Sequence, residues 1–168
     1  IFFDSTKRID FDGASSCMSD KTGKFIFATN STAIIDASGK TMSNGFDIDP
    51  DQNDWAALFP TSCVILPSYY DSNKYFIIHE TNIFTGMDAA ALPLFLRVVN
   101  IPSNIKYGIA EKKSKIFYND TVQMSAMNPV HHANGRDWWL VKPSFNRNEM
   151  IKIHDIRFVN SYKLWIFG

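Results

Sequence analysis

Short strand-like stretches that alternate with turn residues constrain the fold of this chain more than any other feature of its sequence. β-Branched and aromatic residues, which favour strands, concentrate in stretches bounded by turn-forming residues. These stretches are KFIFATN (24–30), TSCVILP (61–67), KYFIIHE (74–80), LFLRVVNI (94–101), SKIFYND (114–120) and RDWWLVKP (136–143). The segment 82–93 is the best candidate for a helix, but it is short and stops at Pro93. The chain is therefore predicted to be all-β.

The turns between these stretches carry hairpin signals. DKTGK (20–24) and DASGK (36–40) share the pattern Asp-x-x-Gly-Lys. An aspartate can accept hydrogen bonds from the backbone that follows it, and glycine can adopt the positive φ that ends such a turn. ANGRD (133–137) contains Asn-Gly, the strongest short hairpin signal, and SYYDSNKY (68–75) is a longer loop in the same role.

Aligning these turns reveals an internal repeat of strand, hairpin and aromatic-rich strand. The matched positions are Cys17, Cys63 and Val130 on the first strands, and Phe25, Tyr75 and Trp138 on the second strands. A repeated antiparallel unit of this kind, followed by further strand-like sequence, is typical of β-propeller blades. A β-sandwich is the alternative, although a sandwich does not predict a repeated hairpin.

The predicted fold is thus an incomplete β-propeller of about three antiparallel blades. Approximate blades cover 8–46, 55–120 and 121–160, and the tail 161–168 is expected to enter a further blade. Propellers close with about four blades or more, since an open wedge exposes apolar faces and strand edges. We therefore expect either a fragment of a longer propeller, which is the favoured interpretation, or a propeller completed by partner segments.

Charge and hydropathy exclude several function classes. The chain has 17 basic and 17 acidic residues, so no basic excess points to nucleic acid. No apolar run approaches the length of about 18 residues that a membrane span needs. Cys17 and Cys63 lie far apart without CxxC spacing, and we expect two small buried side chains rather than a disulfide or a metal site.

The order of short motifs resembles the propeller found at the front of large secreted, surface-associated proteins of Bacteroidetes, many of which are type IX secretion substrates. The most specific matching motif is HANGRDWW (132–139). The other matching motifs are RIDFDG (8–13), SDKTGKFIF (19–27), TMSNG (41–45), SCVILP (62–67) and KYFIIHE (74–80). The match covers most of residues 8–150 and departs from the pattern at 81–93 and at 151–168.

This resemblance implies an extracellular or outer-membrane-surface location in a bacterium and a scaffold role in adhesion, gliding motility or secretion assemblies. The expected partners are other surface or secretion-machinery proteins, with glycans as the alternative. The family supplies no enzymatic activity to transfer. Asp4-Ser5-Thr6 and Asp120-Thr121-Val122 match the Asp-Ser/Thr-apolar sequence that Bacteroidetes glycosylate, which makes Ser5 and Thr121 candidate modification sites.

The stretch HHANGRDWWLVKP (131–143) could be either an active site or a hairpin. Asn134 and Gly135 predict the turn, and successive strand residues point to opposite faces. His131 and His132 should therefore not share a metal ion. We expect His132 to have a structural hydrogen-bonding role.

Metal and catalytic motifs are weak. FDIDPDQND (46–54) contains Asp47, Asp49 and Asp51 as calcium candidates, but it lacks the glycine and glutamate of a calcium loop. No cofactor is expected, and no nucleophile elbow is present. A propeller glycoside hydrolase would need two carboxylates about 5–10 Å apart across a cleft, which any structure can test.

A non-enzymatic scaffold that binds another protein is the first functional hypothesis. A carbohydrate-binding module that uses exposed aromatic side chains, such as Trp55, Tyr69 or Trp139, is the second. The candidate binding residues are Trp55, Tyr69, His132, Arg136 and Trp139.

Overall fold

The computed structural model describes residues 13–46, 48, 63–85, 88–104, 107–119, 122–123, 127–143, 150–157 and 161–167. These residues form strands, turns and loops, and no helix occurs among them. None of this part of the chain therefore provides a helix long and apolar enough to cross a membrane. The prediction of an all-β chain with antiparallel sheets is confirmed.

Within these residues, thirteen strands form three open sheets. The first sheet contains β1 (Ser16–Ser19), β2 (Phe25–Thr29) and β3 (Ile34–Asp36). The second contains β4 (Cys63–Pro67), β5 (Lys74–Thr85) and β6 (Asp88–Asn100), and β6 also pairs with β7 (Ile109–Ala110), β8 (Lys115–Tyr118) and β9 (Val122–Gln123). The third contains β10 (Asn128–His131), β11 (Trp138–Pro143), β12 (Met150–Arg157) and β13 (Ser161–Phe167). Every pairing between these strands is antiparallel.

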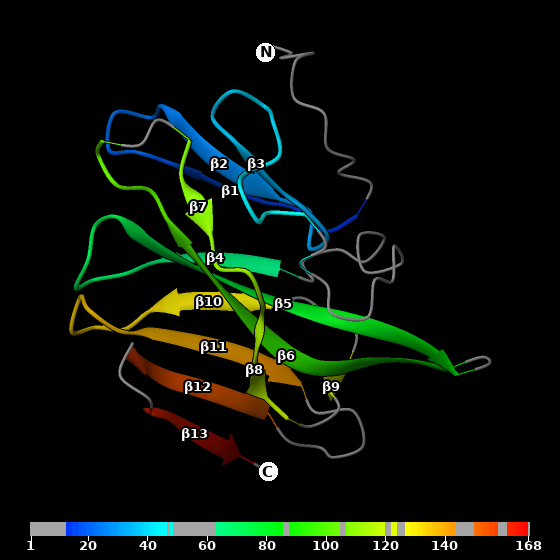
Figure 1. Ribbon diagram of the computed structural model, residues 1–168. Helices are drawn as coiled ribbons and strands as arrows, with labels where there is room; N and C mark the ends of the chain where they lie inside the picture. The colour runs from blue at the N-terminus through cyan, green and yellow to red at the C-terminus, as the bar shows by residue number, and fades with distance from the viewer. Residues whose placement is uncertain are drawn as a thin grey trace.

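The helical candidate and the C-terminal tail both form strands. Residues 82–85 and 88–93 of the helical candidate belong to the long hairpin of β5 and β6, which projects beyond the rest of the second sheet (Figure 1). A bulge between Glu80 and Asn82 interrupts the register where this extension begins. The tail is expected to enter a further blade, but its residues 161–167 form β13, which pairs with β12 within the third sheet.

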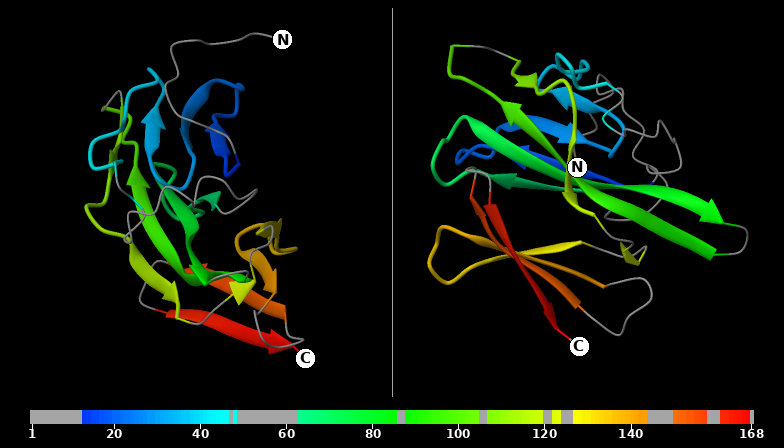
Figure 2. Two further views of the ribbon diagram at one scale, coloured as in Figure 1. Left: turned by 90° about the vertical axis from the view of Figure 1, so that its right-hand side faces the viewer. Right: turned by 60° about the horizontal axis from the view of Figure 1, so that its bottom comes forward.

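The three sheets stack in chain order, with the second sheet between the other two (Figures 1 and 2). Neighbouring residues of a strand point to opposite faces, so the second sheet can bury both of its faces. Ile77 belongs to a core cluster shared with Phe27 and Ile34 of the first sheet. Ile78 belongs to a second cluster that includes Leu140 of the third sheet. Such two-sided burial explains why the second sheet's strands are almost continuously apolar.

The two cysteines have different environments. Cys63 of β4 is buried and its thiol points to the Thr29 carbonyl at 3.9 Å, as expected for a small core residue. Burial raises the pKa of the Cys63 thiol to about 11. The expectation that Cys17 is also buried is wrong, because Cys17 is exposed. Both cysteines are free.

Hydrogen bonds of polar side chains connect the backbone at residue 48 to the second sheet. The Arg97 Nε donates a hydrogen bond of 2.9 Å to the Ser114 hydroxyl, which lies 3.0 Å from Nε2 of His79. The Ser114 hydroxyl in turn donates to the Ile48 carbonyl at 2.9 Å. His79 is fully buried, and burial lowers its pKa from 6.5 to about 3. Its imidazole is therefore neutral in the folded protein at physiological pH.

Two adjacent buried groups give opposite pH dependences of stability. His79 contributes stability that is present above pH 6.5 and is lost as pH falls toward 3. Burial raises the pKa of Glu80 from 4.5 to about 7, so its contribution is present below pH 4.5 and is lost as pH rises to 7. Between pH 4.5 and 6.5 the two groups therefore change the free energy of unfolding in opposite directions as the pH rises.

The variant H79Q should remove the contribution of His79 to the pH dependence of the free energy of unfolding. Its free energy of unfolding should then decrease as pH rises from 4.5 to 6.5, because the opposing contribution of His79 is absent and that of Glu80 remains. Urea denaturation across this range, with the unmodified chain as the control, measures the difference. Parallel pH profiles for the two proteins would contradict the prediction.

Candidate functional site

Three turns share one hydrogen-bonding geometry. The side chain of the first residue accepts a hydrogen bond from the backbone N–H two residues ahead: Asp20 from Thr22 at 2.8 Å, Asp36 from Ser38 at 2.7 Å, and His132 Nδ1 from Asn134 at 3.1 Å. The fourth residue is in each case a glycine with positive φ: Gly23 (83°), Gly39 (82°) and Gly135 (68°). Glycine adopts this conformation without steric cost, so the two Asp-x-x-Gly turns form as predicted.

The stretch HANGRDWW is a hairpin turn between β10 and β11. The Gly135 N–H donates to the His132 carbonyl at 2.9 Å, and the His132 N–H donates to the Asp137 carbonyl at 2.8 Å. The Asn134 side-chain oxygen accepts from the backbone N–H groups of Arg136 and Asp137. The structural role predicted for His132 is thus observed, since its imidazole replaces the carboxylate that the other two turns use.

Asp137 holds the Arg136 side chain in place. The two carboxylate oxygens of Asp137 accept hydrogen bonds from Nε of Arg136 at 3.0 Å and from Nη2 at 3.1 Å. Asp137 is buried and also accepts a 2.6 Å hydrogen bond from the Asn134 side-chain amide. Such a two-pronged pair fixes the plane of a guanidinium that remains about one-third exposed.

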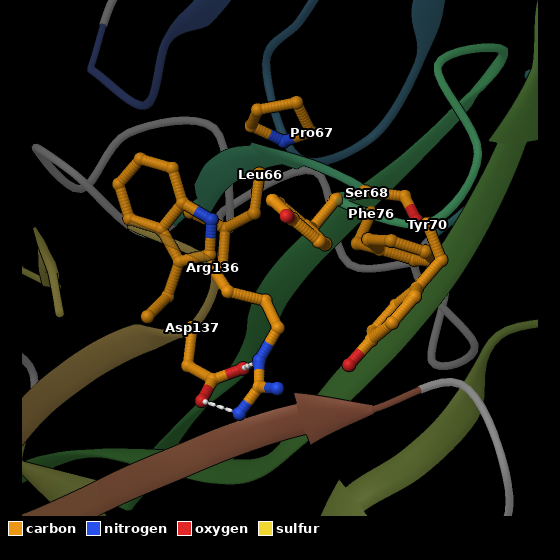
Figure 3. Close-up of a pocket in the computed structure, with 9 residues that line it drawn as sticks. Leu66, Pro67, Ser68, Tyr70, Phe76, Arg136 and Asp137 are labelled. Carbon is orange, nitrogen blue, oxygen red and sulfur yellow. Dashed lines mark hydrogen bonds and ion pairs between the residues drawn. The ribbon is translucent and has the colours of Figure 1, made fainter. Parts of the chain in front are cut away.

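A small pocket lies where this turn meets the loop between β4 and β5 (Figure 3). Its apolar lining comes from strands of the second and third sheets, and its polar rim comes from the two turns. The lining residues are Leu66, Pro67, Ser68, Tyr69, Tyr70, Phe76, Arg136, Asp137 and Trp138. In Figure 3 the paired Arg136 and Asp137 lie on one side and Tyr70 on the other. The pocket therefore combines an apolar floor with a rim of polar and aromatic groups.

The loop that carries the two tyrosines is internally hydrogen-bonded. The Ser68 N–H donates to the Lys74 carbonyl at 3.0 Å, and the Asn73 N–H donates to the Asp71 carboxylate at 3.0 Å. Tyr69 is 65% exposed and Tyr70 is 60% exposed, and their rings meet edge to face at 5.4 Å. Two large aromatic side chains are thus displayed to solvent by an ordered turn.

The structure brings some of the predicted site residues together and separates others. Tyr69 and Arg136 both line the pocket, whereas Trp139 does not. Trp139 opposes Val130 on the other face of the third sheet, where its ring lies 5.1 Å from that of His132. The remaining candidates lie outside the described residues: Trp55, the calcium candidates Asp47, Asp49 and Asp51, and the glycosylation candidates Ser5 and Thr121.

Sequence reasoning missed Trp138, Tyr70 and Ser68 as pocket residues. The period of two placed the two tryptophans on opposite faces but did not decide which of them faces the second sheet. The buried Leu140 provides that information, because residues 138 and 140 share a face. Tyr70 and Ser68 are neighbours of the predicted Tyr69, and only the folded loop shows that they line the same pocket.

The polar groups at this pocket are already engaged with one another. Asp137 is the carboxylate that lines it, and Arg136 and Asn134 already occupy its oxygens. Among the residues that the structure describes, no three histidine, cysteine or acidic side chains gather as a metal site would require. Exposed tyrosines beside an oriented arginine are the residue types that dominate binding energy at protein interfaces.

Comparisons with known proteins add no identification: no family model, no curated protein and no solved structure matches this chain.

Proposed function

We propose that this chain is a non-enzymatic β-propeller scaffold that binds another protein through the pocket of Tyr69, Tyr70 and Arg136. The proposal places it in an extracellular or cell-surface assembly of a bacterium, as the sequence motifs of the hairpins imply. The observation that carries the proposal is the pair of exposed tyrosines that an internally hydrogen-bonded loop holds beside the oriented Arg136.

The arrangement of the sheets supports a scaffold. The turns between β1 and β2, between β4 and β5, and between β10 and β11 lie along one edge of the stack, on the left in Figure 1. Equivalent turns of successive antiparallel sheets line one rim when the sheets are propeller blades. Loops presented by a rigid framework are where proteins most often place binding residues.

The chemistry of the rim supports a protein partner. Tyrosine supplies a large contact area with only two side-chain torsions to immobilise, and its hydroxyl can bond to the partner. Arg136 is already oriented by Asp137, so little conformational entropy is lost when a partner contacts it. Leu66 and Phe76 beneath are almost fully buried and support the rim from below, so the surface offered to a partner is the rim itself.

Removing both tyrosine rings should weaken partner binding strongly. The variant Y69A/Y70A should weaken binding by roughly tenfold to a hundredfold, as expected when exposed aromatic anchors are truncated. Affinity capture from the native host, followed by titration of the captured protein against both forms, measures this change. The fold should be unaffected, because both side chains are mostly exposed.

The matched control is F46A, which removes another exposed aromatic ring, one that does not line the pocket. Capture of the same protein by the unmodified chain and by F46A, but not by Y69A/Y70A, would support the proposal. Equal binding by all three forms would refute it. Saturable binding to a glycan array that depends on the two tyrosines would instead favour the carbohydrate-binding alternative, in which the rings stack on sugars.

A further inference from the structure

A buried ion pair joins the second and third sheets. Glu80 of β5 and Lys142 of β11 are both fully buried, and Oε2 of Glu80 lies 2.6 Å from Nζ of Lys142. By contrast, the pairs Asp71–Lys74 and Glu111–Lys115 each join residues three or four apart in the chain. The Glu80–Lys142 pair therefore spans residues that only the stacking of two sheets brings together.

The surroundings of this pair do not favour net stabilisation. Beyond the contact of Oε2 with Lys142, neither carboxylate oxygen of Glu80 has a hydrogen-bond donor within the part of the chain that the structure describes. Taking a carboxylate and an ammonium out of water costs several kcal/mol each, and their attraction offsets this only when further hydrogen bonds complete the site. An apolar pair of similar size would stabilise the interface between the two sheets at least as well.

The pair does distinguish the two faces of the second sheet. Both faces otherwise contribute similar aliphatic and aromatic side chains to the cores: Val64, Leu66, Phe76, Ile78, Leu94 and Val98 on one side, and Ile65, Ile77 and Val99 on the other. Apolar surfaces of this kind can pack against many partners, because hydrophobic burial is not directional. Glu80 restricts the choice, since any sheet that lacks a matching cation would leave its carboxylate buried and unpaired.

The first sheet shows the contrast. Its side chains packed toward the second sheet include Phe27, Ile34 and Met18, none of which can neutralise a carboxylate. A first sheet from another copy of the chain would therefore be rejected at the face that carries Glu80. The third sheet is accepted because Lys142 follows Trp138 and Leu140 on the face it presents.

We propose that the Glu80–Lys142 pair determines the specificity of sheet packing. It adds no net stability, but it restricts packing on this face of the second sheet to the third sheet. The same principle operates where a single buried polar residue fixes the register and oligomeric state of a coiled coil. In a chain of repeated, similar sheets, this device prevents both incorrect stacking order and association between copies.

The test compares two variants of the full 168-residue chain. E80L/K142L removes the ion pair and makes the interface between the two sheets apolar. E80K/K142E keeps an ion pair at these positions but reverses its charges. Size-exclusion chromatography with light scattering over a range of concentrations gives the assembly state. Methyl NMR spectra of each form show whether one packing arrangement or several are present.

We expect E80L/K142L to raise the fraction of associated chains by roughly tenfold and to split methyl resonances of the interface into several sets. E80K/K142E should keep the assembly state and the single set of resonances of the unmodified chain. The proposal is overturned if E80L/K142L is as uniform as the unmodified chain. Failure of E80L/K142L to fold would also overturn it, because the pair would then be a source of stability.

Discussion

Replacing Lys142 alone by methionine should lower the free energy of unfolding by about 3–5 kcal/mol, because it leaves the Glu80 carboxylate buried without its cation. Methionine resembles the lysine stem in length, so the loss arises from the unpaired charge rather than from a cavity. Urea denaturation at pH 8, above the raised pKa of Glu80, gives the full effect. At pH 5 the loss should be smaller, since Glu80 is then protonated in the folded protein.

The matched control is K115M, which removes the charge of a lysine whose side chain is 70% exposed and pairs with Glu111. An exposed pair of this kind contributes about 0–1 kcal/mol, so K115M should unfold close to the unmodified chain. Equal effects of K142M and K115M would show that Lys142 does not lie in an apolar interface.

Truncating Phe27 to alanine should cost about 3–5 kcal/mol, which is typical of a large aromatic side chain in a core. Phe27 is fully buried between the first and second sheets, and its ring meets that of Tyr75 edge to face at 5.3 Å. The truncation removes the apolar contact area and also leaves a cavity that the two sheets cannot fill without moving. Thermal and urea denaturation of F27A both report this loss.

F46A provides the corresponding control, because Phe46 is 69% exposed and its truncation creates no cavity. Its free energy of unfolding should change by less than about 0.5 kcal/mol, as for most surface substitutions. If F27A were as stable as F46A, the first and second sheets could not be packed face to face.

Turns were the most predictable part of this fold, because their determinants are local. An aspartate that bonds to the backbone ahead of it and a glycine with positive φ lie within five residues of each other, as at Asp20 and Gly23. The hairpin at Asn134 and Gly135 follows from the same short-range chemistry. The all-β class then follows from the strand-like stretches that these turns separate.

The face of the sheet to which each side chain points was harder to predict, because it depends on contacts between residues far apart in the sequence. The repeat alignment equated Cys63 with Val130, yet Cys63 packs toward the first sheet and Val130 is exposed beside Trp139 on the far face of the third. A shift of one residue reverses every side chain of a strand, and the local pattern of the third repeat did not fix this choice. The same uncertainty led to the choice of Trp139 rather than Trp138 for the binding surface.

The buried ion pair left a signal in the sequence that pattern reading can use. Glu80 continues the alternation of Phe76 and Ile78, and Lys142 continues that of Trp138 and Leu140. A charged residue that extends an apolar face is either at the end of the buried stretch or paired inside it. Two such residues of opposite charge on different strands suggest a pair, but only the stacking of the sheets brings these two together.

The stacking of three sheets in chain order is most directly tested by methyl NOEs from two neighbouring residues. Methyl groups of Ile77 should show NOEs to Ile34 of the first sheet, and those of Ile78 should show NOEs to Leu140 of the third. Because adjacent residues of a strand face opposite ways, each isoleucine should lack the other's inter-sheet contacts. NOEs from both isoleucines to a single sheet, as in a two-layer sandwich, would contradict the stacked arrangement.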